Sequence, residues 1–456
     1  MLYKLESWIP IDGSKRDDVT DIVRSIAKRY VDPDEVQEKM LHVPKQEVDG
    51  ITINNWSPLS LGNGFPGICL LLGKLDELFP DEGWDLVGHK YLKKMQSLIQ
   101  QNGIADFSLY DGLAGILIGI EALSRGRTRY QRLLHSLLTF FEEELLRGIK
   151  LYKEEWIEGN VKISDYDVIS GFAGIGRAAL NFSHRPKVKK VVQEICDLFH
   201  ILCNDKLYQA TEIPRWHIKS QDQFLEKERS KYPNGNFNLS ISHGIAGPLA
   251  FLSLAVMNNI SSSHSISNIR KMVEWLSSWE FAGNQGRIFP GRVSLEEFLE
   301  GSVKTTIEGY RDSWCYGVPG IARSIWLAGR ALNNEHWLNS SYQMFLDVEG
   351  RMINNYGLTS DILCHGTSGL LQCIQRIYSE TGDEKMKYIR DTLVEDLISS
   401  YDSHSLFGYY DKKVIDGKYV KADEAGFLNG SAGIAVVLAS LLDSKSPSWD
   451  AALLLQ

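Results

Sequence analysis

Two kinds of segment alternate along the chain. The first kind is a glycine, an apolar residue, any residue and a second glycine, followed by a run of mostly apolar residues, with small variations. Seven such segments begin at Gly64, Gly112, Gly171, Gly244, Gly317, Gly366 and Gly430. Because the runs are apolar on nearly every side, we predict that each forms a helix that is buried on all sides.

The second kind of segment is longer and has one apolar face. Apolar residues recur in it at helical spacing, and charged residues occupy the other face, which predicts amphipathic outer helices. These segments cover residues 18–30, 87–101, 130–148, 188–202, 266–279, 337–352 and 386–401. One lies before each glycine segment, so the repeating unit is an outer helix, a loop, a glycine turn and an inner helix.

Seven helical hairpins can stack as an open solenoid or close into an α/α toroid. We favour closure, because the terminal repeats are as apolar as the middle ones and no repeat has the polar face of a cap. We therefore predict an all-α protein in which residues 1–456 form a single toroidal domain with seven inner and seven outer helices. The connections at 204–240 and 282–312 are predicted to be long loops.

Composition narrows the class of protein. The chain is 43% hydrophobic and 23% charged, which is typical of a globular protein, and its formal net charge is −9. It has no run of five basic residues, so nucleic acid is not expected as its main partner. The N-terminus lacks the apolar core of a signal peptide, and no apolar stretch approaches the ~20 residues that span a bilayer. We predict a cytoplasmic protein whose membrane association, if any, is peripheral.

The six cysteines are too few for a disulfide framework in a chain of this length. Cys69, Cys196, Cys203 and Cys373 lie within apolar helical patterns and are predicted to be core residues. Cys315 and Cys364 instead precede glycine turns.

Aligning the seven repeats on the first glycine gives two informative columns. The residue directly before that glycine is polar in every repeat: Asn63, Asp111, Ser170, His243, Tyr316, His365 and Asn429. The residue two places before it includes both Cys315 and Cys364. In a closed fold these columns form a ring, which would bring both cysteines, His365 and His243 together. The alternative is that the polar residues cap the inner helices, and we expect capping at Asn63, Asp111 and Asn429.

Two cysteines and one histidine form a nitrogen and sulfur ligand set that suits zinc. Three protein ligands leave one coordination position open, as in catalytic zinc sites. Two thiolates and a neutral imidazole already cancel the metal's charge, so this ion is suited to holding a substrate thiolate rather than to generating hydroxide. The chemistry indicated is thiol addition or alkylation. The alternative is that the cysteines and the histidine are ordinary buried residues.

Four motifs together resemble those of the LanC-like lanthionine cyclases, most closely the bacterial cyclases of class I lantibiotic biosynthesis. They are Trp-Cys-Tyr-Gly at 314–317, Cys-His-Gly at 364–366, Ser-His-Gly-Ile-Ala-Gly at 242–247 and Tyr-Asp-Val-Ile-Ser-Gly at 166–171. The resemblance extends from about residue 50 onward. It implies an α/α toroid with one zinc ion, which adds cysteine thiols of a precursor peptide to dehydroalanine or dehydrobutyrine.

The resemblance also implies roles for individual residues. Cys315, Cys364 and His365 would be the zinc ligands. His243 and Asp167 would act as acid and base near the metal, with the assignment between them left open. Arg311 would stabilise the enolate formed by thiol attack, and Tyr316 is a further catalytic candidate whose alternative role is that of a packed aromatic residue with a bonded hydroxyl.

The resemblance implies partners as well: a dehydrated precursor peptide with its leader, a dehydratase and an ABC transporter at the cytoplasmic face of the membrane. Two long connections would rim the zinc face and, together with Trp156 and Trp216, would shape a peptide groove. They are the segments 204–240 and 282–312. The alternative is that these connections have only a structural role. Some bacterial members carry a small subdomain inserted in the toroid. Three alternatives remain for function: addition of glutathione to dehydroamino acids, a prenyltransferase β-subunit, and a non-catalytic scaffold with structural zinc.

Overall fold

The computed structural model describes residues 7–48, 51–208, 210–283, 285–304, 310–415 and 418–456. The chain divides into two compact units. The first unit contains Met1–Asp106, Tyr110–Leu137 and Leu358–Asp450, and the second contains Phe107–Leu109, Leu138–Gly357 and Ala451–Gln456. The long helix α6 (Gln131–Ile157) carries the chain from the first unit into the second.

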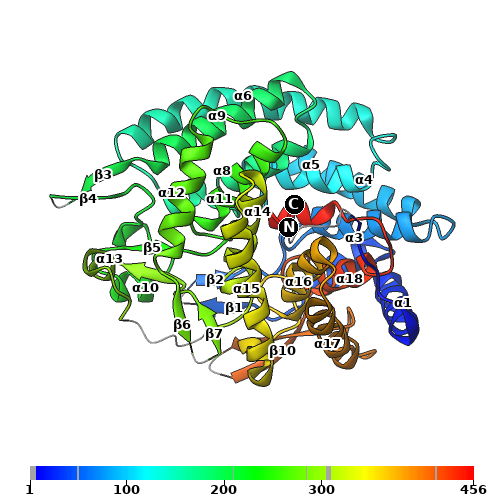
Figure 1. The fold of residues 1–456 in the computed structure, drawn as a ribbon. Coiled ribbons are helices and arrows are strands. Elements are labelled where there is room, and N and C mark those ends of the chain that lie inside the picture. The colour runs from blue at the N-terminus through cyan, green and yellow to red at the C-terminus, as the bar shows by residue number, and fades with distance from the viewer. Residues whose placement is uncertain (1–6, 49–50, 209, 284, 305–309, 416–417) are drawn as a thin grey trace. The chain divides into compact units, whose positions relative to one another are not determined.

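The first unit is built on helices that are buried on nearly every side. These are α3 (Phe65–Leu78), α5 (Leu113–Ala122), α16 (Thr367–Thr381) and α18 (Ser431–Ser440). Amphipathic helices pack on them: α1 (Gly13–Ala27) on α18, α4 (Trp84–Asn102) on α3 and α17 (Glu384–Ser400) on α16 (Figure 1). The smaller elements are η1 (Lys28–Tyr30), α2 (Pro33–Leu41), η4 (Trp449–Leu453) and two hairpins, β1 (Gln46–Val48) with β2 (Ile51–Ile53) and β9 (Tyr410–Ile415) with β10 (Lys418–Asp423).

The second unit repeats this plan. Its buried helices are α8 (Phe172–Asn181), α11 (Ala246–Met257) and α14 (Val318–Ala331), with α11 packed between the other two. The amphipathic helices α9 (Pro186–Cys203), α12 (Ser265–Ser277) and α15 (Glu335–Arg351) pack on α8, α11 and α14 in turn. Short helices α7 (Ile163–Tyr166) and η3 (Met352–Gly357) complete the helical part. Every predicted inner and outer segment is therefore a helix.

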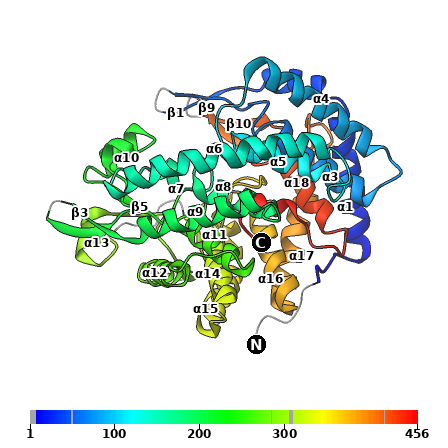
Figure 2. The same cartoon turned by 90° about the horizontal axis from the view of Figure 1, so that it is seen from above.

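The described parts of the predicted long connections at 204–240 and 282–312 are not structureless. These segments and their borders contain short elements: β3 (Asp205–Tyr208), β4 (Thr211–Pro214), η2 (Ser220–Asp222), α10 (Glu226–Lys231), β5 (Asn236–Asn238), β6 (Phe281–Gly283), β7 (Gly286–Ile288), β8 (Arg292–Ser294) and α13 (Leu295–Glu300). Strand β5 pairs antiparallel with β8, which joins the two segments through Phe237 and Val293, both fully buried. Buried backbone needs hydrogen-bond partners, and this pairing supplies them. Figure 2 shows β3, α10, β5 and α13 gathered at one end of the unit.

The N-cap residues of the inner helices differ from those predicted. The N-cap residues of α3, α5 and α18 are Gly64, Gly112 and Gly430, each in an extended conformation. The preceding residues Asn63, Asp111 and Asn429 therefore lie one position too early to be the N-cap residues, and that prediction is wrong.

Glycine is required at the second glycine position of the motif for a steric reason. A Cβ atom at Gly320 would lie 2.3 Å from the carbonyl oxygen of Trp314, six residues earlier. Glycines 67, 174 and 433 meet the carbonyl six residues earlier in the same way, at 2.1, 2.0 and 1.8 Å. The turn thus brings the backbone of each inner helix against the segment that leads into it, which only glycine allows.

The predicted core cysteines Cys69, Cys196, Cys203 and Cys373 are all buried, as expected. Burial raises the thiol pKa of Cys196 and Cys203 to about 12, so neither is a nucleophile at neutral pH. Among the described helices, none is both long enough and apolar enough to cross a membrane.

Candidate functional site

In the second unit, Cys315 lies in the turn before α14. It is 4% exposed, and its Sγ atom lies 3.6 Å from the Ser313 hydroxyl and 4.0 Å from Nη2 of Arg311. Both groups can donate a hydrogen bond to a thiolate at this position. The neighbouring Trp314 is fully buried, and its indole donates to the carbonyl of Leu453 at 2.9 Å, which anchors the turn.

The turn at Cys315 closes on Gly317. Its φ is +122°, and a Cβ atom there would lie 2.0 Å from the carbonyl oxygen of Arg311. Any other residue would be strained and would displace the Arg311 backbone. The glycine thus holds Arg311 and Cys315 close together.

In the first unit, Cys364 and His365 lie in the corresponding turn before α16. The Cys364 amide donates to the carbonyl of Leu428 at 2.9 Å, and Gly366 begins the helix as its N-cap residue. Both ligand candidates are only partly buried, so their side chains are accessible.

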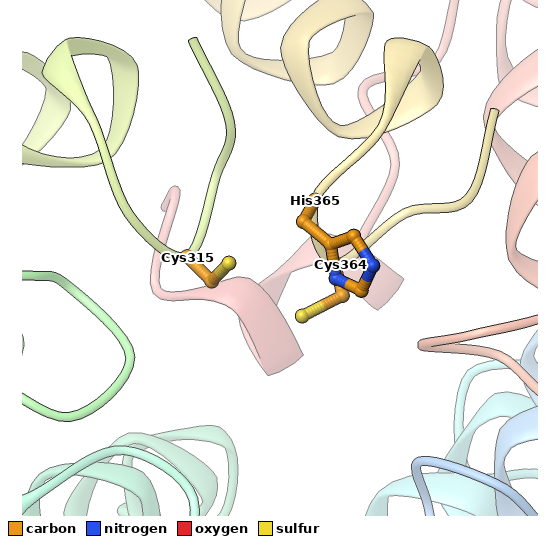
Figure 3. A group of neighbouring side chains, drawn as sticks. All are labelled: Cys315, Cys364 and His365. Carbon is orange, nitrogen blue, oxygen red and sulfur yellow. The ribbon is translucent and has the colours of Figure 1, made fainter. Parts of the chain in front are cut away.

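The Sγ atoms of Cys315 and Cys364 and an imidazole nitrogen of His365 lie within 4.8 Å of one another (Figure 3). Ligand atoms of a tetrahedral site with bonds of ~2.3 Å lie about 3.8 Å apart, so small side-chain rotations would bring these three donor atoms onto one ion. The donor set of two sulfurs and one nitrogen also matches zinc chemistry. These residues therefore fit the metal that the sequence predicts.

The second unit also holds the predicted acid and base pair. His243 Nδ1 lies 2.7 Å from Asp167 Oδ2, and the other carboxylate oxygen, Oδ1, accepts from the amides of Ser170 and Gly171, both at 2.8 Å. Asp167 is 1% exposed, whereas the His243 side chain is 28% exposed. With Nδ1 donating to the carboxylate, the free lone pair of the neutral ring is on Nε2. His243 can therefore move protons, and Asp167 fixes its ring.

Tyr316 lies beside this pair. Its ring centroid is 6.4 Å from that of His243, and its hydroxyl accepts from Nδ2 of Asn238 at 2.8 Å. The half-exposed ring of Phe224 also packs edge-on against His243, with the ring centroids 5.5 Å apart. The histidine is thus flanked by two aromatic rings, one of which carries a bonded hydroxyl.

Trp156 and Trp216 do not line a groove, contrary to the prediction. Both are fully buried, Trp156 against Phe172 and Phe199 and Trp216 against Trp275. Their apolar rings contribute to the core of the second unit.

Sequence reasoning missed a third informative column, four residues before the first glycine. Ser60, Ser240 and Ser313 each accept, through the hydroxyl, the backbone amide three residues later, at 3.1–3.2 Å. Asp167 occupies the same position and bonds the amide of Ser170 in the same way. Extending the alignment by two positions would have shown that Asp167 is the one carboxylate in a column that holds serine in four of the seven repeats.

A buried ion pair in the first unit was also missed. Glu424, 3% exposed, pairs with Lys413 across the β9–β10 hairpin. Burial raises the pKa of Glu424 to about 7, although Lys413 opposes the shift, and His365 is among the groups whose charge acts on it. No local pattern marks this pair, because it depends on the register of the hairpin.

The structure thus defines an all-α protein of glycine-turn hairpins with a candidate thiolate and imidazole metal centre. The sequence model described as "Lanthionine synthetase C-like protein" matches residues 55–454, and the chain belongs to this family. The Nisin biosynthesis protein NisC of Lactococcus lactis subsp. lactis is 27% identical over 409 residues, covering 88% of this chain and 90% of NisC. The solved structure of nisin cyclase matches with a TM-score of 0.74 at 24% identity, covering 96% of this chain and 97% of nisin cyclase. Nisin cyclase is an α/α toroid, so the predicted fold class is confirmed.

Proposed function

We propose that the protein is a zinc-dependent lanthionine cyclase. It adds cysteine thiols of a dehydrated precursor peptide to dehydroalanine and dehydrobutyrine residues, which gives lanthionine and methyllanthionine rings. The observation that carries the proposal is the grouping of Cys315, Cys364 and His365, in a chain of the LanC-like family. A zinc ion bound there would lower the pKa of a substrate thiol, so that a thiolate is available at neutral pH.

The ligand set determines which chemistry is favoured. Two thiolates and a neutral imidazole balance the charge of a divalent ion, which leaves a substrate thiolate electron-rich enough to attack carbon. The Ser313 hydroxyl and Arg311 lie near Cys315 Sγ, where each can donate a hydrogen bond to a thiolate ligand.

His243 is the proposed proton donor to the α-carbon of the substrate. The thiol gives up its proton, sulfur bonds to the β-carbon, and the carbon–carbon π electrons move onto the substrate carbonyl as an enolate. His243 Nε2 then supplies a proton to the α-carbon, so nothing is lost in the addition. Asp167 is too buried to touch the substrate, and we assign it the positioning role rather than the donor role. A donor fixed on one side of the enolate sets the new stereocentre.

Arg311 and Tyr316 complete the site. Arg311 offers a guanidinium group beside the metal ligand Cys315, where it would stabilise the negative charge of the enolate. Tyr316 would support the same charge through its hydroxyl, oriented by Asn238.

The peptide and protein partners belong to the proposal as well. The substrate is a dehydrated peptide that still carries its leader, and the enzyme works with a lantibiotic dehydratase and an ABC transporter at the cytoplasmic face of the membrane. The connections at 204–240 and 282–312 precede the turns of His243 and Cys315 in the chain, which supports a role for them at the rim of the substrate site.

The test compares two thiol sources. The protein is incubated with a dehydrated precursor peptide that contains cysteines, and separately with glutathione and a cysteine-free dehydroalanine peptide. Alkylation of free thiols followed by mass spectrometry counts the rings. Ring closure in the first mixture supports the cyclase, whereas a glutathione adduct without ring closure would assign the protein to glutathione addition.

A further inference from the structure

Three polar residues of the first unit have no role in the proposed mechanism. Asn63, Asp111 and Asn429 each lie directly before the first glycine of a buried helix, and none of them is an N-cap residue. His365 holds the same position before α16 and is a candidate metal ligand. The polar residues at the other three positions therefore call for an explanation other than helix capping.

The four turns that carry these residues share one backbone conformation. The first glycine is extended in each turn, with φ between −121° and −148° and ψ between −163° and −174°. The amide directly after that glycine donates to the carbonyl seven residues earlier, at 2.8–3.0 Å in all four turns. The side chains directly before the glycines therefore project from equivalent positions, and from this position the imidazole of His365 reaches the metal centre.

Backbone hydrogen bonds place the four turns side by side. The Cys364 amide donates to the carbonyl of Leu428 at 2.9 Å, and the Leu428 amide donates to the carbonyl of Gly62 at 2.8 Å. The Leu61 amide in turn donates to the carbonyl of Tyr110 at 2.7 Å. The residues before the glycines thus form a polar row, which consists, in spatial order, of His365, Asn429, Asn63 and Asp111.

The spacing of the polar row matches a peptide that leaves the metal in an extended conformation. Backbone segments joined by hydrogen bonds lie about 4.8 Å apart, which places Asn63 about 10 Å and Asp111 about 15 Å from His365 along the row. An extended peptide rises about 3.3 Å per residue. A chain whose cysteine is held at the metal would therefore pass Asn63 and Asp111 about three to five residues away from that cysteine.

Asn63 and Asp111 offer such a peptide one donor and one acceptor. Asn429 Nδ2 donates to Asn63 Oδ1 at 3.4 Å, which occupies the oxygen of the Asn63 carboxamide. Among the described residues, Nδ2 of Asn63 has no hydrogen-bond partner, and the residue is partly exposed. Asp111 is exposed, and its carboxylate accepts hydrogen bonds. Every peptide bond presents the matching carbonyl and N–H groups.

We propose that Asn63 and Asp111 bind the backbone of the peptide substrate, about three to five residues away from the reacting cysteine. Asn63 Nδ2 donates to a peptide carbonyl, Asp111 accepts from a peptide N–H, and Asn429 positions the carboxamide of Asn63. Because these bonds are made to the backbone, they do not depend on the side chains that flank the cysteine. The inference rests on the proposed function, because it requires a peptide thiol held at the metal.

The test measures the binding of a peptide that cannot react. A fluorescently labelled peptide of about 15 residues, with one central cysteine among alanine, glycine and serine, contains no dehydrated residue and reaches past both contacts in either direction. Its Kd for the zinc-loaded protein is measured by fluorescence anisotropy. The tripeptide Gly-Cys-Gly with blocked ends, measured by competition, offers the same thiol but is too short to reach Asn63 or Asp111.

Asn63→Ala should raise the Kd of the long peptide about fivefold, as expected for the loss of one hydrogen bond, and should leave the Kd of the tripeptide unchanged. Asp111→Ala should have the same effects. Asn102→Ala, at an exposed residue that ends α4, is the matched control and should bind both peptides as the wild type does. All three variants should keep the zinc content and the melting temperature of the wild type.

Equal Kd values of the long peptide for the wild type and for either row variant would overturn the inference. A parallel loss of affinity for the tripeptide would also overturn it, because the substitution would then act on the metal centre. With a dehydrated precursor peptide, Asn63→Ala should raise KM about fivefold. A wild-type protein that binds the long peptide but closes no rings would contradict the proposed function alone, because the comparison of Kd values needs no turnover.

Discussion

His243 Nδ1 and Asp167 Oδ2 lie 2.7 Å apart, although the two residues are separated by 76 positions in the chain. Because the second carboxylate oxygen is held by two backbone amides, the carboxylate cannot rotate away from the imidazole. This relationship leaves Nε2 as the imidazole nitrogen that does not contact the carboxylate. It also gives Asp167 two tasks, one in the glycine turn and one in orienting the histidine.

Asp167→Asn should separate these two tasks. The amide oxygen can still accept from Ser170 and Gly171, but an NH₂ group in place of Oδ2 cannot accept from His243. We expect kcat for ring closure to fall by about 10²–10⁴-fold, as when a catalytic histidine loses its orienting carboxylate, with little change in the melting temperature. A variant with wild-type kcat would show that the histidine needs no partner.

Arg311→Lys tests the stabilisation of the enolate. Nη2 of Arg311 lies 4.0 Å from Cys315 Sγ, and a lysine keeps the charge but loses the planar pair of donors. We expect kcat to fall by about 10²-fold while the protein retains its metal content. Arg147→Lys, at an exposed ion pair with Glu144, is the control and should behave as the wild type. Equal rates for the two variants would remove Arg311 from the mechanism.

The repeat pattern predicted the seven inner and seven outer helices because each depends on local periodicity and on the steric need for glycine at a turn. The assignment of Asp167 beside His243 came from the family resemblance alone, because the column four residues before the glycine, in which Asp167 is the one carboxylate, was not compared. The β5–β8 pairing was missed for a related reason: three-residue strands such as Asn236–Asn238 carry too short a pattern to predict a partner more than 50 residues away. Trp156 and Trp216 were placed at a groove from their position in the chain, whereas burial depends on packing that sequence does not specify.

The variant Cys315→Ala tests whether the metal is needed for catalysis or for folding. Cys373→Ala, at a fully buried cysteine in α16 outside the candidate centre, is the matched control for the loss of a buried sulfur. Both variants should lose about 1–2 kcal/mol in the free energy of unfolding. Only Cys315→Ala should lose its bound metal and its ring-closing activity. If Cys315→Ala fails to fold while Cys373→Ala folds, the metal is structural and the scaffold interpretation is correct.

His217 should make the protein sensitive to acid. The residue is 1% exposed, and burial lowers its pKa from 6.5 to about 4, with nearby Lys206 acting in the same direction. The unfolded chain therefore binds more protons than the folded one between pH 6.5 and 4, so stability falls as the pH falls through this window. Between pH 7.5 and 5 the loss from this group is about 2 kcal/mol.

His217→Gln tests this expectation. Its amide can still donate to the carbonyl of Asn234, the partner of His217 Nε2 at 3.0 Å, but it does not titrate. Urea unfolding at the two pH values should show a smaller loss of stability in the variant than in the wild type. Equal losses in both proteins would mean that other groups cause the acid sensitivity.

Under the proposed function, a metal held by Cys315, Cys364 and His365 is required for thioether formation. The most direct measurement determines zinc per chain in the purified protein and, in the same samples, the rate of ring closure on a dehydrated precursor peptide before and after chelation. We predict one zinc ion per chain, loss of activity when it is removed from a protein that stays folded, and recovery when zinc is returned. Full ring-closing activity in a metal-free protein would contradict the account.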